Sequence, residues 1–245
     1  MEHVSIAAEK IFEIAGFPIT NSLLTSVIVI ILLIVLGVIV GSKAKYIPSK
    51  IQIFFEMMID GIWGLAKGVS PHFAHEFFPL TMTLFLFILF SNWIGLLPGF
   101  SALGIKHVID GKEILTPVFR AGTADLNTTI ALAIISMVMV QYYGIKHVGL
   151  KLHLGKFFNF KNPVDAFVGI LELVSEFSKI ISFAFRLFGN IFAGEILLVV
   201  ITSLIPLLLP LPFLGLEIFV GFIQAVVFSV LTMVFISSAL EVHHS

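Results

Sequence analysis

The chain has 245 residues, of which 58% are hydrophobic and 12% are charged, and its mean hydropathy of +1.10 lies far outside the range of soluble globular domains. Its formal net charge of −1 gives no basis for a nucleic-acid partner. Because the chain has no cysteine, disulfides, thiolate metal sites and cysteine nucleophiles are excluded. The composition predicts a polytopic membrane protein, and we expect neither a metal nor a cofactor.

The first crossing is predicted over residues 22–42, which are apolar and long enough to span a hydrocarbon core of about 30 Å. Acidic residues precede it instead of the short basic start of a signal peptide, so we expect this crossing to be retained. Lysines without an acid follow in residues 41–50. Under the positive-inside rule this end lies in the cytoplasm, which puts the N-terminus outside.

Three further helices are predicted before residue 163. Residues 49–70 mix aromatic residues and methionines with charges, which is typical of a helix at the membrane interface and equally of a linker packed on other helices. Crossings are predicted over residues 77–98 and 122–145, with Thr123 or Asp125 as N-cap of the second. Residues 101–121 form a polar loop that we expect outside. Lysines without an acid in residues 144–162 predict a second cytoplasmic segment.

The last two helices are predicted over residues 163–205 and 211–241, with a proline-rich turn between them. The first would be about 60 Å long at 1.5 Å per residue, twice what a perpendicular crossing needs. It either breaks near Gly189 and Asn190 or lies strongly tilted, and we favour the tilted helix because the segment offers few turn residues. The fold class is therefore all-α, with about five crossings, an interfacial helix and a long tilted hairpin, in a single membrane domain over residues 1–245.

Arg186 is a charged side chain inside an almost unbroken apolar run. A charge at the centre of a bilayer costs roughly 2.5–3.5 kcal/mol on insertion scales, so we expect Arg186 to face protein or water and to have a function. At about 100° per residue, Glu172, Lys179 and Arg186 form one polar stripe that Asn190 continues. Glu195 lies on the opposite side of the helix, and we do not expect it to pair with Arg186.

Polar residues of the last helix lie at matching heights if the hairpin turns near Pro206. Glu217 and Gln224 share a face, and antiparallel pairing sets Arg186 level with Gln224 and Glu195 level with Glu217. Carboxylates reached from two opposite sides, with a fixed cation between them, are what two half-channels for a proton or a small cation require. The remaining half-channel candidates are Glu172, Glu176 and Lys179 towards the cytoplasm, and Asp125 and Asn127 towards the outside.

Structural roles compete with transport for several polar residues. Polar side chains in membrane bundles often link helices, which we expect for Asn92, Ser136 and Ser229. For Glu172 and Lys179, an ion pair at the helix end explains the residues as well as transport does.

The segment from Ser182 to Glu195 reads Ser-Phe-Ala-Phe-Arg-Leu-Phe-Gly-Asn-Ile-Phe-Ala-Gly-Glu, and its Arg-Leu-Phe-Gly-Asn core is highly diagnostic. By this segment the chain resembles subunit a of the membrane sector, Fo, of the rotary F-type ATP synthase. The resemblance covers most of the chain from about residue 77 onward, and the N-terminal third matches only in pattern. Supporting matches are Leu171-Glu172-Leu-Val-Ser, Ala124-Asp125-Leu-Asn127-Thr-Thr, Asn92-Trp-Ile-Gly-Leu-Leu-Pro98 and Gln224-Ala225.

The resemblance implies a stator subunit without catalysis of its own, whose half-channels carry protons to and from the c-ring. Arg186 matches the arginine that faces the essential carboxylate of the ring and prevents a short-circuit. Glu195, Glu217 and Gln224, with Asn190, match positions of the proton path and the ring contact, although some relatives carry histidine where Glu217 stands. The implied partners are the c-ring, the peripheral-stalk subunit b and the lipid bilayer, most simply that of a bacterial inner membrane.

Two hypotheses remain open at this point. Glu195 and Glu217 share a proton-relay site on the outer side, because two close carboxylates rarely both ionise. The alternative function is a stand-alone ion or anion transporter that uses Arg186 as substrate ligand, which predicts inverted repeats or paired broken helices. The sequence contains neither of these, and it does not decide between H⁺ and Na⁺.

Overall fold

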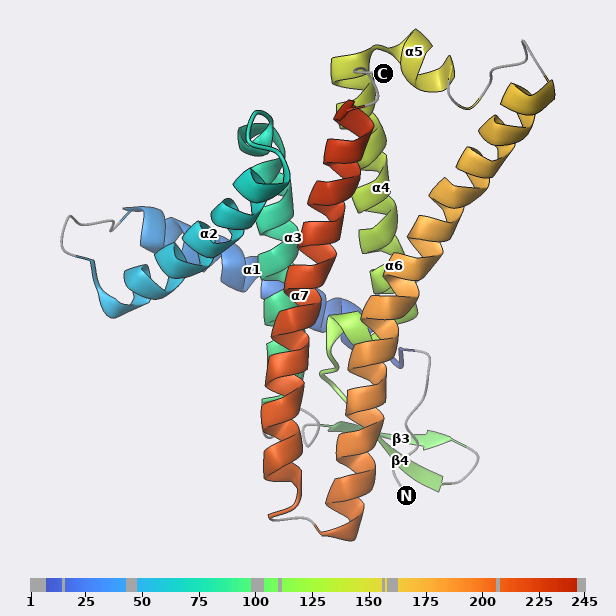
Figure 1. Cartoon of the computed structure of the whole chain (residues 1–245). Helices are drawn as coiled ribbons and strands as arrows, with labels where there is room; N and C mark the ends of the chain where they lie inside the picture. The colour runs from blue at the N-terminus through green and yellow to red at the C-terminus, as the bar shows by residue number, and fades with distance from the viewer. Residues whose placement is uncertain are drawn as a thin grey trace.

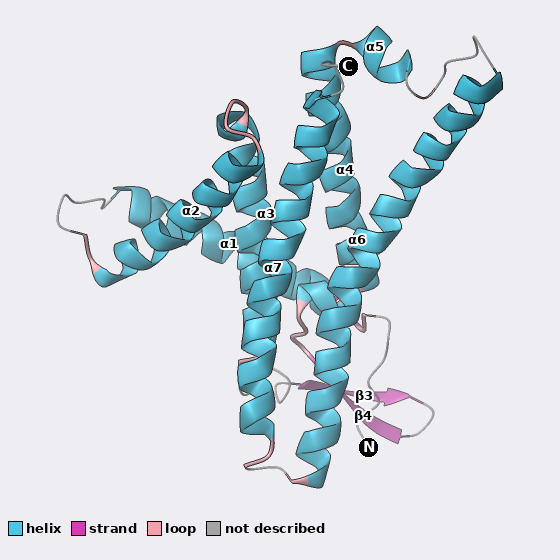
Figure 2. Ribbon diagram, in the orientation of Figure 1, coloured by secondary structure: helices cyan, strands magenta, loops and turns pink. Residues whose placement is uncertain are grey.

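The computed structural model describes residues 8–14, 16–42, 48–97, 104–109, 112–155, 157, 163–205 and 208–241, and helices dominate this part of the chain (Figure 2). Five of them, α1, α3, α4, α6 and α7, are long and apolar enough to cross a membrane. This confirms the predicted all-α polytopic fold. The helices are α1 (Asn21–Ser42), α2 (Lys50–Val69), α3 (Ala74–Gly95), η1 (Gly122–Ala124, a 3-10 turn), α4 (Leu126–Val148), α5 (Leu150–Gly155), α6 (Pro163–Leu204) and α7 (Pro210–Glu241).

Helices α3, α4, α6 and α7 form a bundle in which α7 contacts the other three (Figure 1). Large apolar side chains fill its centre, among them Phe85 and Ile88 of α3, Leu187 of α6 and Phe228 of α7. The ring of Phe183 on α6 lies 4.8 Å from that of Phe228. These contacts determine which faces of α6 and α7 turn inwards, and therefore which polar residues face outwards.

Helix α6 is uninterrupted over 42 residues, so neither Gly189 nor Asn190 breaks it into two spans. Towards the end of the bundle that carries α5, it diverges from α7 (Figure 1). Its first half is therefore largely exposed, including Val164, Phe167 and Phe177. A contiguous apolar surface of this kind fits lipid or a partner subunit. The tilt of α6 in the bilayer stays a prediction.

Helix α1 joins the rest of the protein mainly through its start. Asn21, Ser22 and Thr25 in its first two turns are buried, most later residues are exposed, and the helix extends away from the bundle (Figure 1). Helix α2 begins after Ser49, whose side chain accepts a hydrogen bond from the Gln52 N–H, and it packs on α3. Its location at the membrane interface stays a prediction.

Two β-hairpins occur where the sequence predicted no strands. β1 (Lys10–Ile14) pairs with β2 (Phe17–Thr20), and β3 (Gly104–Ile109) pairs with β4 (Lys112–Pro117), both antiparallel. The second hairpin corrects the prediction of a polar loop over residues 101–121. Ile109 pairs with Lys112, and the sequence between them is Asp-Gly, a pair of residues that strongly favours a two-residue hairpin turn.

Both ends of α4 differ from the prediction for residues 122–145. The helix begins at Leu126, because Gly122–Ala124 form η1, and Asp125 is its N-cap. At the other end Gly149 has a φ of 88°, a conformation that glycine adopts without steric cost. The chain turns there into the short helix α5, which lies within the segment predicted as a cytoplasmic loop.

Candidate functional site

Arg186 lies on the exposed face of α6. Its guanidinium is 3.4 Å from Oγ of Ser182, one turn earlier, and it forms no ion pair with any residue that the structure describes. Phe185 is exposed as well, whereas Ala184 and Leu187 are buried. The face that carries Arg186 therefore turns away from the bundle, and its charge is available to a group outside this chain.

Asn190, on the next turn of α6, links the two helices of the hairpin. Its Nδ2 donates to Oε1 of Gln224 on α7 at 2.6 Å. Gln224 is buried, and its Nε2 has no partner in the described part of the chain. The prediction that Arg186 is level with Gln224 stays a prediction, because a hydrogen bond between two side chains does not fix the relative heights of their backbones. The connection between the helices lies where it was expected, since α6 ends at Leu204 and α7 begins at Pro210.

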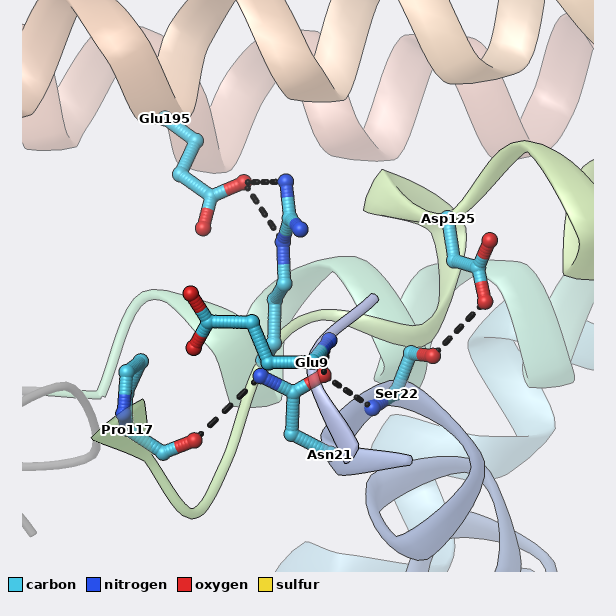
Figure 3. A network of polar contacts seen from close by, with 7 residues as sticks. Glu9, Asn21, Ser22, Pro117, Asp125 and Glu195 are labelled. Carbon is cyan, nitrogen blue, oxygen red and sulfur yellow. Dashed lines mark hydrogen bonds and ion pairs between the residues drawn. The ribbon is translucent and has the colours of Figure 1, made fainter. Parts of the chain in front are cut away.

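Glu195 is bound by Arg120, a residue that the sequence placed in the outer loop (Figure 3). Nε and Nη2 of Arg120 both lie 3.2 Å from Oε2 of Glu195. The Arg120 side chain is only 5% exposed and lies over the ring of Phe192, 5.6 Å from its centroid. Such a buried cation needs a partner, because an uncompensated charge in a low-dielectric site is costly. The signal for it in the sequence is a single arginine in an apolar stretch directly before a crossing.

The start of α1 and the segment before it support this ion pair (Figure 3). Asn21 donates from Nδ2 to the carbonyl of Pro117 at 3.2 Å. It also binds the backbone of Glu9 twice, through Oδ1 at 3.3 Å and through its own N–H at 3.0 Å. Figure 3 shows the Glu9 side chain among these residues, and one of its carboxylate oxygens is buried without a described partner. A second acidic side chain therefore lies near the Arg120–Glu195 pair.

Asp125 and Asn127, the predicted outer half-channel candidates, make structural contacts. Ser22 Oγ donates to Asp125 Oδ2 at 2.7 Å. Oδ1 of Asp125 accepts from the backbone N–H of Asn127 at 3.0 Å and from its Nδ2 at 3.3 Å. These bonds join the start of α4 to the start of α1.

Glu217 is a buried carboxylate on α7, only 4% exposed, and it makes no hydrogen bond or ion pair with the described residues. Its carboxylate lies against Gly194 of α6, where any Cβ would collide with it. Glu195 is the next residue of α6, so the two carboxylates lie at one level of the hairpin. No hydrogen bond joins them, however, because Glu195 is turned to Arg120.

A second polar group surrounds a cavity of about 60 Å³ at the α5 end of the bundle. Nζ of Lys179 is 2.7 Å from Oε1 of Glu176, and Nε2 of Gln141 donates to Oε2 of the same carboxylate at 3.1 Å. A water molecule needs roughly 10–15 Å³ of such volume, so the cavity has room for several. It is lined by Val140, Gln141, Glu172, Glu176, Lys179, Phe235, Ser238 and Ala239.

Asn92 and Ser136 link helices, as expected, whereas the structure shows no such link for Ser229 among the described residues. Asn92 donates to the carbonyl of Gly221 at 2.9 Å, and the hydroxyls of Ser136 and Thr232 are 2.7 Å apart. Ser229 is buried without a described partner. Among the described residues, no group of three His, Asp or Glu side chains is placed to hold a metal ion.

Comparison with known proteins identifies the family. A family model described as ATP synthase A chain matches residues 23–237. The chain belongs to this family. The chloroplastic ATP synthase subunit a of Stigeoclonium helveticum is 35% identical over 246 residues, which cover 100% of this chain and 94% of the relative. As a member of the ATP synthase A chain family, the chain is a non-catalytic subunit of Fo in proton translocation, is integral to the membrane, and functions with the c-ring and other Fo subunits. The stand-alone transporter is thereby excluded.

Proposed function

We propose that this subunit provides two separate access paths for protons to the ring carboxylate, with Arg186 between them on the face that meets the c-ring. The observation that carries the proposal is the position of Arg186. Its charge lies on the outward face of α6 beside exposed apolar residues such as Phe185. No described acidic residue of this chain is paired with it. A charge at bilayer depth requires a partner, and a carboxylate of the c-ring supplies one.

The energy of such a pair is large enough to control a proton. Two unit charges about 4 Å apart attract by about 4 kcal/mol at an effective dielectric constant of 20. This corresponds to about a thousandfold change in the protonation equilibrium of the ring carboxylate. The ring site therefore releases its proton as it reaches Arg186, and a protonated site does not pass directly from one path to the other. Proton flow is in this way tied to ring rotation.

Each access path is assigned to one group of polar residues. Glu217 and the Arg120–Glu195 pair line the first path. The Asn190–Gln224 bond lies between these residues and Arg186. The cavity beside Glu172, Glu176 and Lys179 provides the second. The lysines at the α5 end make that end cytoplasmic under the positive-inside rule, with the N-terminus outside. We assign the c-ring to the Arg186 face and subunit b to another surface, in a bacterial inner membrane.

The test is the replacement of Arg186 by lysine and by alanine. Lysine keeps the charge but lacks the planar guanidinium and deprotonates more readily when buried, so we expect both variants to lose ATP synthesis driven by an imposed proton gradient. The measurement uses membrane vesicles that contain the assembled complex. Lys10→Ala, which removes an exposed cation paired with Glu13, is the control and should retain the normal rate. Synthesis at the unmodified rate in either Arg186 variant contradicts the proposal.

A further inference from the structure

His153 of the short helix α5 packs against α4 of the bundle. His153 is only 3% exposed, and its imidazole lies so close to Gly144 of α4 that a Cβ at residue 144 would collide with it. The turn at Gly149, with its positive φ, brings α5 back onto α4. The ring of Phe157 lies 6.1 Å from the imidazole at a steep angle. His153 is thus held between α5 and α4, and it contacts Gln141, a residue that lines the cavity.

A series of hydrogen bonds connects His153 to Glu176 through the side chain of Gln141. A carboxylate only accepts, so Glu176 requires the Gln141 side chain to present its NH₂ group at 3.1 Å. The Gln141 oxygen then points to His153, and Nε2 of the imidazole donates to it at 2.6 Å. Lys179 donates to the other oxygen of Glu176 at 2.7 Å. The chain His153 to Gln141 to Glu176 therefore joins α5 to the wall of the cavity.

We propose that His153 is a positioning residue for proton passage at the α5 end, and that it acts by fixing the Gln141 amide against Glu176. The inference rests on the proposed access path through this cavity and names a residue that controls it. The amide between His153 and Glu176 has no readily transferable proton, so His153 does not carry protons itself. Without its N–H, the Gln141 side chain is free to rotate, and the Glu176–Lys179 pair loses the donor that keeps it at the cavity.

The test compares His153→Leu, Gln141→Leu and the double variant in the full complex in inverted membrane vesicles. Hydrogen bonds to charged groups are each worth enough to change a rate about tenfold. We therefore expect ATP-driven proton pumping, normalised to assembled complex, to fall about tenfold in either single variant. The double variant should lose no more than one single variant, because both changes break the same connection. His153→Gln restores an N–H donor and should pump within about twofold of the unmodified complex.

Lys151→Gln is the matched control, since Lys151 is exposed on the same short helix, and it should pump normally. A purely structural role of His153 predicts that His153→Gln fails like His153→Leu, and this result would overturn the proposal. Losses that multiply in the double variant would overturn it as well. Arg186→Ala is measured alongside: if it abolishes pumping while His153→Leu and Gln141→Leu pump normally, the access path stands and only the positioning role is wrong.

Discussion

Two arginines, Arg120 and Arg186, occupy opposite environments in this subunit. Arg120 is buried and bonded to Glu195 through two nitrogens, whereas Arg186 is exposed and has no described acidic partner. Arg186 could be found from the sequence, because it interrupts a long apolar run. Arg120 could not be paired in advance, since its partner is 75 residues away and the contact depends on how the segment before α4 folds against α1. The ion pair fixes the direction of Glu195, which the sequence left undetermined.

At this scale we predict that Arg120→Gln slows proton translocation. Both hydrogen bonds from Arg120 end on one oxygen of Glu195 and count as a single charge-assisted contact, worth about 1.5–3 kcal/mol, and the partial exposure of Glu195 favours the lower end of that range. We expect ATP-driven pumping to fall about tenfold, measured per assembled complex. Lys10→Gln, which removes an exposed cation, should have no effect. Normal pumping by Arg120→Gln would show that the ion pair is only structural.

At the scale of elements, α6 and α7 of the hairpin make a tight contact where Gly194 meets the Glu217 side chain. The buried carboxylate occupies the space that a side chain at residue 194 would need. Gly189, five residues earlier on the same helix, has open space where its Cβ would be. The two glycines have the same intrinsic helix propensity but different steric surroundings.

This difference predicts unequal effects of two alanine substitutions. Gly194→Ala forces the Glu217 carboxylate, the flexible end of its side chain, out of its buried position. This offsets the gain in helix propensity, so the midpoint of thermal unfolding of the purified subunit complex should stay below that of Gly189→Ala. Gly189→Ala meets nothing and improves helix propensity by roughly 0.5–1 kcal/mol, so its midpoint should stay the same or rise. Equal midpoints for the two variants would contradict the close contact. Pumping should also fall in Gly194→Ala, because Glu217 is displaced.

The elements themselves were predictable to different degrees. Apolar length alone located the five crossings, and the scarcity of turn residues correctly favoured one helix over the 42 residues of α6. The hairpin of β3 and β4 was missed although its Asp-Gly signal is local, because the polar composition of the segment suggested a loop. The connection between α6 and α7 was predicted to within a residue, whereas the bond from Asn190 to Gln224 was missed, since it depends on how the two side chains turn towards each other.

At the scale of the whole molecule, the subunit is incomplete without partners. Much of α1, α2 and the first half of α6 exposes large apolar residues, which only lipid or other subunits can cover. The two polar groups are buried or half-buried between helices, whereas Arg186 lies on the exposed face of α6. In the proposed function, the residues of the two access paths supply and remove the proton, and Arg186, on a different face, acts on the carboxylate of the rotating c-ring.

The proposed ring contact can be tested by cross-linking, and the chain has no cysteine that would interfere. Ser182 is exposed beside Arg186, whereas Ala184, two residues further on the same helix, is 1% exposed. With a second cysteine next to the essential carboxylate of the ring helix, Ser182→Cys should form a disulfide under mild oxidation and Ala184→Cys should not. The yield is read from non-reducing gels of the assembled complex. Because the two sites differ in facing and hardly in depth, a higher yield from Ala184→Cys would mean that the c-ring meets another face of α6. Arg186 would then act on a group other than the ring carboxylate.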